Sequence, residues 1–245
     1  MIEVKDLGLV YKEAGSGRPN PVIQNLSLSV EAGESVAIIG PSGCGKSSLL
    51  YILSGLLRPS SGNARIAEQE VTKPRQDVAL MLQESGLLPW KSVWDNATLG
   101  SRKNKAERRE RLQEAFEELG IAGMEARYPS QISGGEKRRV SLARALAQEV
   151  KVILMDEPLA ALDTLTKEAT QNLILTLWKR HSFTLVLVTH DIEEALFLGQ
   201  RVLIFAPRPT HVVTTVENPK MGEVSYRQSQ EFFDRVQQVR GLLQT

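Results

Sequence analysis

The sequence predicts an α/β fold built on a parallel β-sheet that helices cover on both faces. Short apolar runs of strand length occur at residues 35–39, 152–155, 185–188 and 202–205, and helical patterns lie between the later runs. Strands that are buried on both faces are apolar throughout, because neither side meets water. The chain has 245 residues, of which 42% are hydrophobic and 24% are charged, so it can bury a core of this kind.

Two regions depart from this pattern. Residues 1–30 alternate apolar and polar side chains around a glycine- and proline-rich stretch, which predicts an N-terminal antiparallel β-subdomain with an exposed loop. Residues 84–147 are mainly helical, and the alternation of Glu and Arg there favours a solvated helix face over a nucleic-acid patch. An apolar stripe at helical spacing marks one of these helices: Leu112, Ala115, Phe116 and Leu119.

A phosphate-binding loop follows the strand at residues 35–39. Residues 40–47 fit the pattern G-x-x-x-x-G-K-[ST], and a helix begins directly after them. A glycine-rich turn at a helix N-terminus offers backbone N–H groups and the helix dipole to a phosphate. The alternative is a glycine-rich turn that binds nothing, but such a turn would not need a strand before it and a helix after it. Lys46 can reach the β- and γ-phosphates, and the Ser47 hydroxyl can ligate Mg²⁺. The residues expected to contact a nucleoside triphosphate are Gly40, Pro41, Ser42, Gly43, Cys44, Gly45, Lys46, Ser47 and Ser48.

Two carboxylates end the apolar strand at residues 152–155. Ligands of open α/β sheets lie beyond the carboxyl ends of the strands, so Asp156 and Glu157 are expected beside the phosphate loop. Asp156 is suited to hold Mg²⁺, directly or through water. Glu157 can polarise the water that attacks the γ-phosphate.

The segment Ile132-Ser133-Gly134-Gly135-Glu136 provides a second group of phosphate donors. A serine hydroxyl and glycine N–H groups at a helix start can bind an anion, although the same residues also form an ordinary N-cap. Followed by a helix and then by the Asp156–Glu157 strand, this segment resembles the signature motif of ATP-binding-cassette (ABC) ATPases. The resemblance extends from Tyr11 to about Pro209.

That resemblance implies a P-loop NTPase (RecA-like) core and further site residues. Gln83 matches the glutamine that touches Mg²⁺ and the attacking water, and His190 matches the histidine at the γ-phosphate. Together with Lys46 and Glu157, they form the expected catalytic group. Tyr11 matches an aromatic residue that stacks on adenine. The expected Mg²⁺ ligands are Ser47, Gln83 and Asp156.

In the family, two cassettes pair head to tail around two ATP molecules, so a homodimer is expected. Ser133, Gly134, Gly135 and Asp163, the last within the loop Ala161-Leu162-Asp163, would then act on the nucleotide of the partner. The family also implies a single domain over residues 1–245. Its expected parts are a core with the β-subdomain (1–84 and 148–215), an inserted helical subdomain (85–147) and a C-terminal helical extension (216–245).

Three segments resemble the nitrate, sulfonate and taurine importer group: Leu87-Leu88-Pro89-Trp90, residues 191–198 and Ala206-Pro207-Arg208-Pro209. The implied partners are transmembrane permease subunits and, indirectly, an extracytoplasmic solute-binding protein. Trp90 is either an exposed anchor for the permease or a core residue of the helical subdomain. The expected location is the cytoplasmic face of the inner membrane, as a peripheral subunit. A soluble ABC ATPase, an exporter subunit and a nucleotide-gated module that barely hydrolyses ATP stay open as alternatives.

The chain departs from that group in three places. Glu136 stands where glutamine or methionine is usual, Lys137-Arg138-Arg139 is unusually basic, and Ala160 replaces a frequent glycine. Because of these departures, the sequence does not identify the transported solute.

Composition restricts the partners and the functional classes that this protein can have. Lys and Arg number 30 against 29 Asp and Glu, a formal charge of +1, so no nucleic-acid partner is expected. Cys44 is the single cysteine, so the chain cannot form an internal disulfide. Cys44 is either a small side chain that fills the turn or a site of redox control. No signal peptide or membrane-spanning run is recognisable. One helical stripe near the end can pack on its own domain or recruit a partner: Phe232, Val236, Val239 and Leu243.

Overall fold

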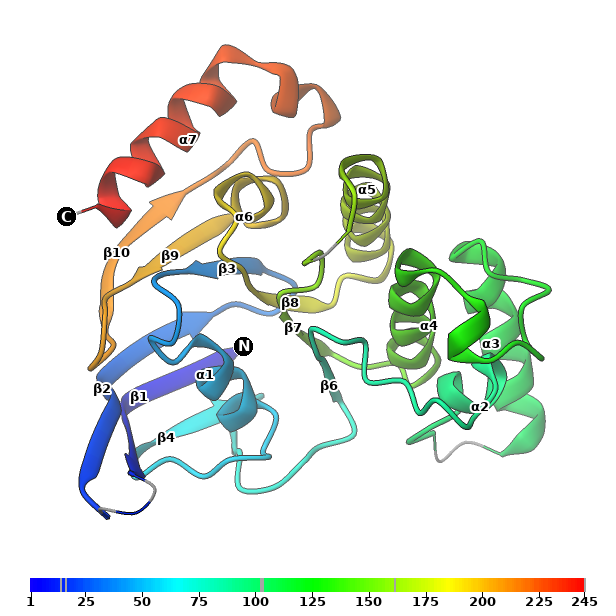
Figure 1. Cartoon of the computed structure of the whole chain (residues 1–245), viewed down its shortest axis with the longest axis horizontal. Coiled ribbons are helices and arrows are strands. Elements are labelled where there is room, and N and C mark those ends of the chain that lie inside the picture. The colour runs from blue at the N-terminus through cyan, green and yellow to red at the C-terminus, as the bar shows by residue number, and fades with distance from the viewer. Residues whose placement is uncertain (14, 16, 102–103, 161, 245) are drawn as a thin grey trace.

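The computed structural model describes residues 1–13, 15, 17–101, 104–160 and 162–244, and it confirms the predicted α/β class (Figure 1). A six-stranded sheet forms the centre of the molecule. All neighbouring strands pair in parallel except β10, which pairs antiparallel with β9 at one edge. In sheet order the strands are β10 (Val212–Glu217), β9 (Arg201–Phe205), β3 (Ser35–Ile39), β8 (Thr184–Val188), β7 (Val152–Asp156) and β6 (Val78–Met81).

The central strands are buried on both faces, as their apolar runs predict. In β3, Val36 and Ile38 belong to one buried cluster, while Ala37 and Ile39 belong to another. This separation follows from the two-residue period of a strand, which sends successive side chains to opposite faces. Each face therefore needs its own apolar cover.

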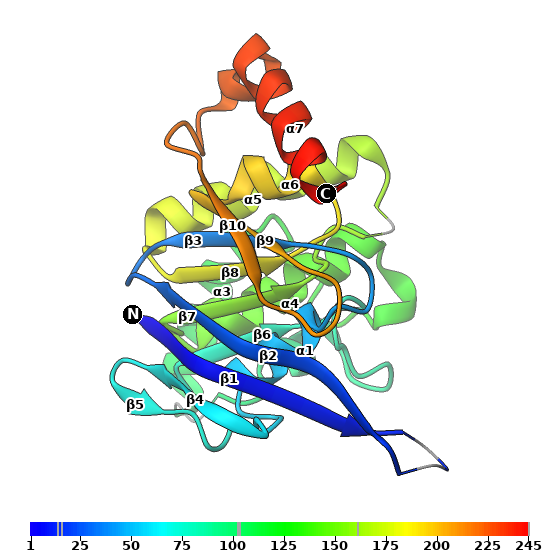
Figure 2. The same ribbon diagram turned by 90° about the vertical axis from the view of Figure 1, so that its left-hand side faces the viewer.

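The antiparallel sheet and the first helix cover one face. The predicted N-terminal β-subdomain is a four-stranded sheet in the order β2-β1-β4-β5, which lies beside the central sheet in Figure 2. Helix α1 (Lys46–Leu53) contributes Leu49, Leu50 and Ile52 to the cluster shared by the two sheets. The strands of this sheet are β1 (Ile2–Lys12), β2 (Pro19–Val30), β4 (Ser61–Ile66) and β5 (Gln69–Glu70).

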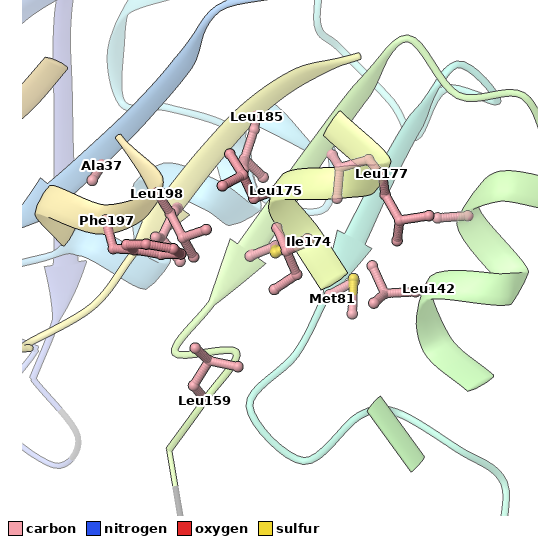
Figure 3. Close-up of a cluster of buried hydrophobic side chains, with 14 of the residues drawn as sticks. Ala37, Met81, Leu142, Leu159, Ile174, Leu175, Leu177, Leu185, Phe197 and Leu198 are labelled. Carbon is pink, nitrogen blue, oxygen red and sulfur yellow. The ribbon is translucent and has the colours of Figure 1, made fainter. Parts of the chain in front are cut away.

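Helices α5 (Thr164–His181), α6 (Ile192–Leu198) and α7 (Gln230–Leu243) contribute to the cluster on the opposite face. Figure 3 shows Ala37 and Leu185 of the sheet near Leu175 of α5 and Phe197 of α6. In α7 the side chains of Phe232, Val236 and Val239 are buried and Leu243 is partly buried. The apolar stripe of this helix thus packs on its own domain. A short 3₁₀ helix, Val224–Gln228, precedes it.

A group of helices is inserted between β6 and β7, beside β6 in Figure 1. It comprises α2 (Val93–Ala97), α3 (Lys105–Glu118), the 3₁₀ helix Pro129–Gln131 and α4 (Gly134–Ala147). The predicted stripe of α3 is buried, and Phe116 meets Trp94 edge to face with ring centroids 5.8 Å apart. The domain boundaries given above stay a prediction. Among the described helices, none has both the length and the apolar composition needed to cross a bilayer.

Candidate active site

The phosphate loop connects β3 to α1 in a conformation that requires glycine. Gly45 has φ = 118°, in the left-handed region, and a Cβ there would lie 2.8 Å from Cγ1 of Val22. At Gly40 a Cβ would lie 2.9 Å from the backbone oxygen of Phe205. Cys44 is buried in the core cluster next to the loop, which fits the role of a small side chain that fills the turn.

The side chain of Lys46 lies inside the curve of the loop. Its Nζ donates hydrogen bonds to the backbone oxygens of Gly40, at 2.8 Å, and Pro41, at 3.0 Å. Only 7% of the residue is exposed, so the loop itself holds the ammonium group in place. This arrangement orders a positive charge at the helix N-terminus, where an anion is already favoured.

Ser47 and Asp156 join the two predicted motifs. The Ser47 hydroxyl donates to Oδ1 of Asp156 at 3.0 Å, although the residues are 109 positions apart in the chain. Burial raises the pKa of the Asp156 carboxyl, and the hydrogen bond from Ser47 partly offsets this effect. A hydroxyl and a carboxylate are oxygen donors of the kind that Mg²⁺ prefers. The described residues contain no group of three or more His, Cys, Asp or Glu side chains that could hold a metal ion.

Glu157 and His190 meet at the ends of adjacent strands. Glu157 has φ = 46°, an uncommon value for a residue with a side chain, and its N–H donates to the oxygen of Val188 at 2.8 Å. Nδ1 of His190 lies 3.3 Å from Oε1 of Glu157. Backbone strain of this kind is often found at functional sites, where the surrounding structure maintains it.

Tyr11 lies beside the start of α1. Its hydroxyl is 3.3 Å from Oγ of Ser48, and 40% of the residue is exposed. The predicted aromatic residue is therefore next to the phosphate loop and accessible to a planar ligand.

The signature segment forms a separate group at the start of α4. Ser133 accepts a hydrogen bond from the N–H of Glu136 at 3.2 Å, and the Glu136 carboxylate accepts one from the N–H of Ser133 at 2.6 Å. These two bonds form a capping box, and the second lowers the pKa of Glu136. The unusual Glu136 thus caps the helix and remains charged.

The loop at Asp163 lies against this signature segment. Asp163 caps α5 by accepting from the N–H of Thr166 at 3.1 Å. A Cβ on Gly135 would lie 2.9 Å from Cγ2 of Thr166, so the starts of α4 and α5 are in close contact. Within the described residues no hydrogen bond or ion pair joins Ser133–Gly135 or Asp163 to the phosphate loop, and Ala161 lies outside them.

Gln83 lies two residues beyond β6 with an exposed side chain. Its backbone oxygen accepts a hydrogen bond from Nη2 of Arg138 in α4, at 2.8 Å. In the described part of the chain, the Gln83 side chain forms no hydrogen bond to Ser47 or Asp156.

Two arginines that touch the site were missed as site residues. Arg208 donates to the backbone oxygen of Gly43 in the phosphate loop, and Arg138 holds the backbone at Gln83. The turn that contains Arg208 and the basic run that contains Arg138 were both visible in the sequence. Neither pattern indicates which backbone oxygen the guanidinium reaches.

Comparison with known proteins identifies the family of this chain. The profile of the family described as ABC transporter matches residues 23–160. The taurine import ATP-binding protein of Chromobacterium violaceum is 42% identical over 83% of this chain and 79% of its own. An aliphatic sulfonates import ATP-binding protein of Pseudomonas aeruginosa is 44% identical over 81% of this chain and 72% of its own. A dimeric ATP-binding cassette, solved in a post-hydrolysis state with ADP and Pi, has 29% identity and a TM-score of 0.76 over 89% of this chain and 98% of its own. This chain therefore belongs to the ABC transporter family, as an ATP-hydrolysing subunit.

Proposed function

We propose that this subunit hydrolyses ATP at the phosphate loop in order to power the import of a small solute, of the taurine or sulfonate class, through separate permease subunits. The observation that carries the proposal is the hydrogen bond from Ser47 to Asp156, which unites the phosphate loop with the acidic strand end. The names of the relatives in Chromobacterium violaceum and Pseudomonas aeruginosa support the solute class.

In the proposed mechanism, the Lys46 ammonium and the backbone N–H groups of residues 40–48, except that of Pro41, which has none, bind the β- and γ-phosphates. Tyr11 stacks on adenine. Ser47 and Asp156, with Gln83, would hold Mg²⁺, which neutralises phosphate charge when bound. Glu157 accepts a proton from the attacking water. His190, at 3.3 Å from Glu157, orients that carboxylate and contacts the γ-phosphate.

The second half of the site is proposed to come from another copy of the chain. Ser133, Gly134, Gly135 and Asp163 form a group apart from the phosphate loop. In a head-to-tail dimer this group would contact the γ-phosphate bound by the partner. The dimeric cassette with ADP and Pi supports this arrangement.

Trp90 supports contact with a permease. The residue is 70% exposed, although it is a large aromatic side chain, so it contributes little to the subdomain core. Exposed tryptophans of this kind are common anchors at protein interfaces. The proposed location is accordingly the cytoplasmic face of the inner membrane, with an extracytoplasmic binding protein that delivers the solute.

The steady-state ATPase rate of Glu157→Gln tests the catalytic assignment. We expect kcat to fall at least about 100-fold, because general-base catalysis contributes about 100-fold or more. Glu193→Gln removes an exposed carboxylate three residues after His190 and should keep the wild-type rate. Equal rates for Glu157→Gln and wild type would refute the role of Glu157.

Co-purification tests the transport assignment. The tagged protein should bring down a polytopic membrane protein, and Trp90→Ala should weaken this association without lowering the basal ATPase rate. A protein that sediments with ribosomes instead would contradict the importer proposal.

A further inference from the structure

Lys167 of α5 joins two segments that are far apart in the chain. Its Nζ donates a hydrogen bond to Oδ2 of Asp191, and the two charged groups form an ion pair. Its backbone N–H donates to the oxygen of Asp163 at 2.8 Å. One residue therefore contacts both the loop that precedes α5 and the turn that follows β8.

Asp191 is the centre of the turn at His190. Its Oδ1 accepts a hydrogen bond from the N–H of Glu194 at 2.9 Å, and its own N–H donates to Oγ1 of Thr189 at 3.0 Å. The Thr189 hydroxyl in turn donates to Oε2 of Glu194 at 2.8 Å. The residues on both sides of His190 thus belong to one hydrogen-bonded group, and Lys167 connects this group to α5.

The ion pair is partly shielded from water. The Lys167 side chain is 26% exposed and the Asp191 side chain 31%. Burial acts to raise the pKa of Asp191, but the hydrogen bonds from Lys167 and from the N–H of Glu194 lower this pKa below its ordinary value, so the carboxylate is charged. An exposed ion pair is screened by water and restrains little, whereas a partly buried pair with further hydrogen bonds keeps a fixed geometry. The pair can therefore hold the turn at His190 in a fixed position relative to α5.

We propose that Lys167 is a positioning residue for His190, and that it links the turn at His190 to the loop at Asp163. Asp163 is proposed to act on the nucleotide of a partner subunit and His190 on the nucleotide of its own, so the inference rests on the proposed function. The start of α5 also contacts the signature segment, since a Cβ on Gly135 would lie 2.9 Å from Cγ2 of Thr166. A shift of this region when a partner subunit binds would therefore reach His190 through Lys167.

A double-mutant cycle on ATP hydrolysis tests whether Lys167 acts through His190. Lys167→Gln should lower kcat about 10-fold with the KM for ATP changed less than about twofold, because Lys167 does not contact the nucleotide in the proposed mechanism. In the His190→Ala background the same substitution should lower kcat less than about twofold, since no imidazole is left to position. A loss of about 10-fold in both backgrounds would show that Lys167 acts independently of His190 and would overturn the proposal.

Conservative variants and matched controls test the ion pair itself. Lys167→Arg keeps a positive charge that can donate to Asp191, so its kcat should lie within about threefold of wild type. Asp191→Asn keeps an acceptor for the N–H of Glu194 but loses the charge, so it should lose as much as Lys167→Gln. Lys151→Gln and Glu193→Gln remove exposed charges and should stay within about twofold of wild type. A Lys167→Arg variant as slow as Lys167→Gln would refute a role for the ion pair.

Amide hydrogen exchange gives a readout that does not depend on activity. Lys167→Gln should speed exchange at residues 189–194, and Asp191→Asn should speed it at residues 163–168, because each substitution releases the segment on the other side of the pair. Exchange in β1, which is remote in sequence from both segments, should stay as in wild type. Exchange that changes only beside the substituted side chain, or that rises equally in β1, would refute the link between the two segments.

The proposed function can fail separately from this inference. If His190→Ala keeps the wild-type kcat, the role of His190 in hydrolysis is refuted, while the exchange experiment still decides whether Lys167 holds the turn. If His190→Ala lowers kcat and Lys167→Gln does not, the proposed function stands and the positioning role of Lys167 is refuted.

Discussion

Glu194→Gln should change how the stability of the protein depends on pH. Burial raises the pKa of the Glu194 carboxyl from 4.5 to about 7. The Thr189 hydroxyl, Lys167 and His190 oppose this effect, and Asp191 adds to it. A tenfold change in proton affinity corresponds to about 1.4 kcal/mol, so ionising Glu194 costs the folded state about 3 kcal/mol.

The direction in which stability changes with pH follows from proton binding. Between about pH 4.5 and 7 the folded protein keeps a proton on Glu194 that the unfolded chain releases. Stability from this group is therefore fully present below pH 4.5 and is lost as the pH rises towards about 7. Glutamine resembles the protonated form and does not titrate. The free energy of unfolding of wild type minus that of Glu194→Gln should fall by about 3 kcal/mol over this range.

Urea unfolding of both proteins at about five pH values provides the measurement, since other titrating groups cancel in the difference. Glu193→Gln is the control, because that carboxylate is exposed. A difference that does not vary with pH would refute the desolvation argument. A variant that is more stable than wild type at neutral pH would show that the buried carboxylate lowers the stability of the folded protein.

Three further predictions concern the nucleotide site and the core. Tyr11→Ala should weaken ATP binding about 10-fold in a fluorescent-nucleotide titration, because the stacking surface is lost. Tyr11→Phe keeps the ring and should bind ATP as wild type does. Equal affinities for Tyr11→Ala and wild type would contradict stacking. Phe116→Ala should lower the free energy of unfolding by about 3–5 kcal/mol in urea, since the ring is buried against Trp94; a loss below about 1 kcal/mol would contradict tight packing. Ser133→Ala should cost about 1 kcal/mol of stability through loss of the cap and should also lower kcat. An unchanged kcat would show that Ser133 caps the helix and has no role in hydrolysis.

Several features of the fold could be predicted because local patterns carry them. The apolar run of β3 predicts burial on both faces, and its alternating residues enter two different clusters. The stripe of α3 predicts the buried face with Phe116. For α7 the pattern left two uses open, since an apolar stripe looks the same whether it packs on its own domain or on a partner.

The phosphate loop and the acidic strand end were determined by the sequence. Glycine is required where a Cβ would collide, as at Gly45, and the end of a parallel strand brings Asp156 to Ser47. These features depend on residue types at fixed local spacing, so a single sequence contains them.

Tertiary structure alone decided what the charged side chains near the site do. Arg138 lies in a basic run that is typical of a solvated surface, and Glu194 lies in an acidic helix start, yet both are buried. Arg208 donates to the phosphate loop from a turn whose sequence does not indicate this contact. Burial, and with it the cost and the partner of a charge, depends on how helices and strands from distant parts of the chain pack together, which no local pattern specifies.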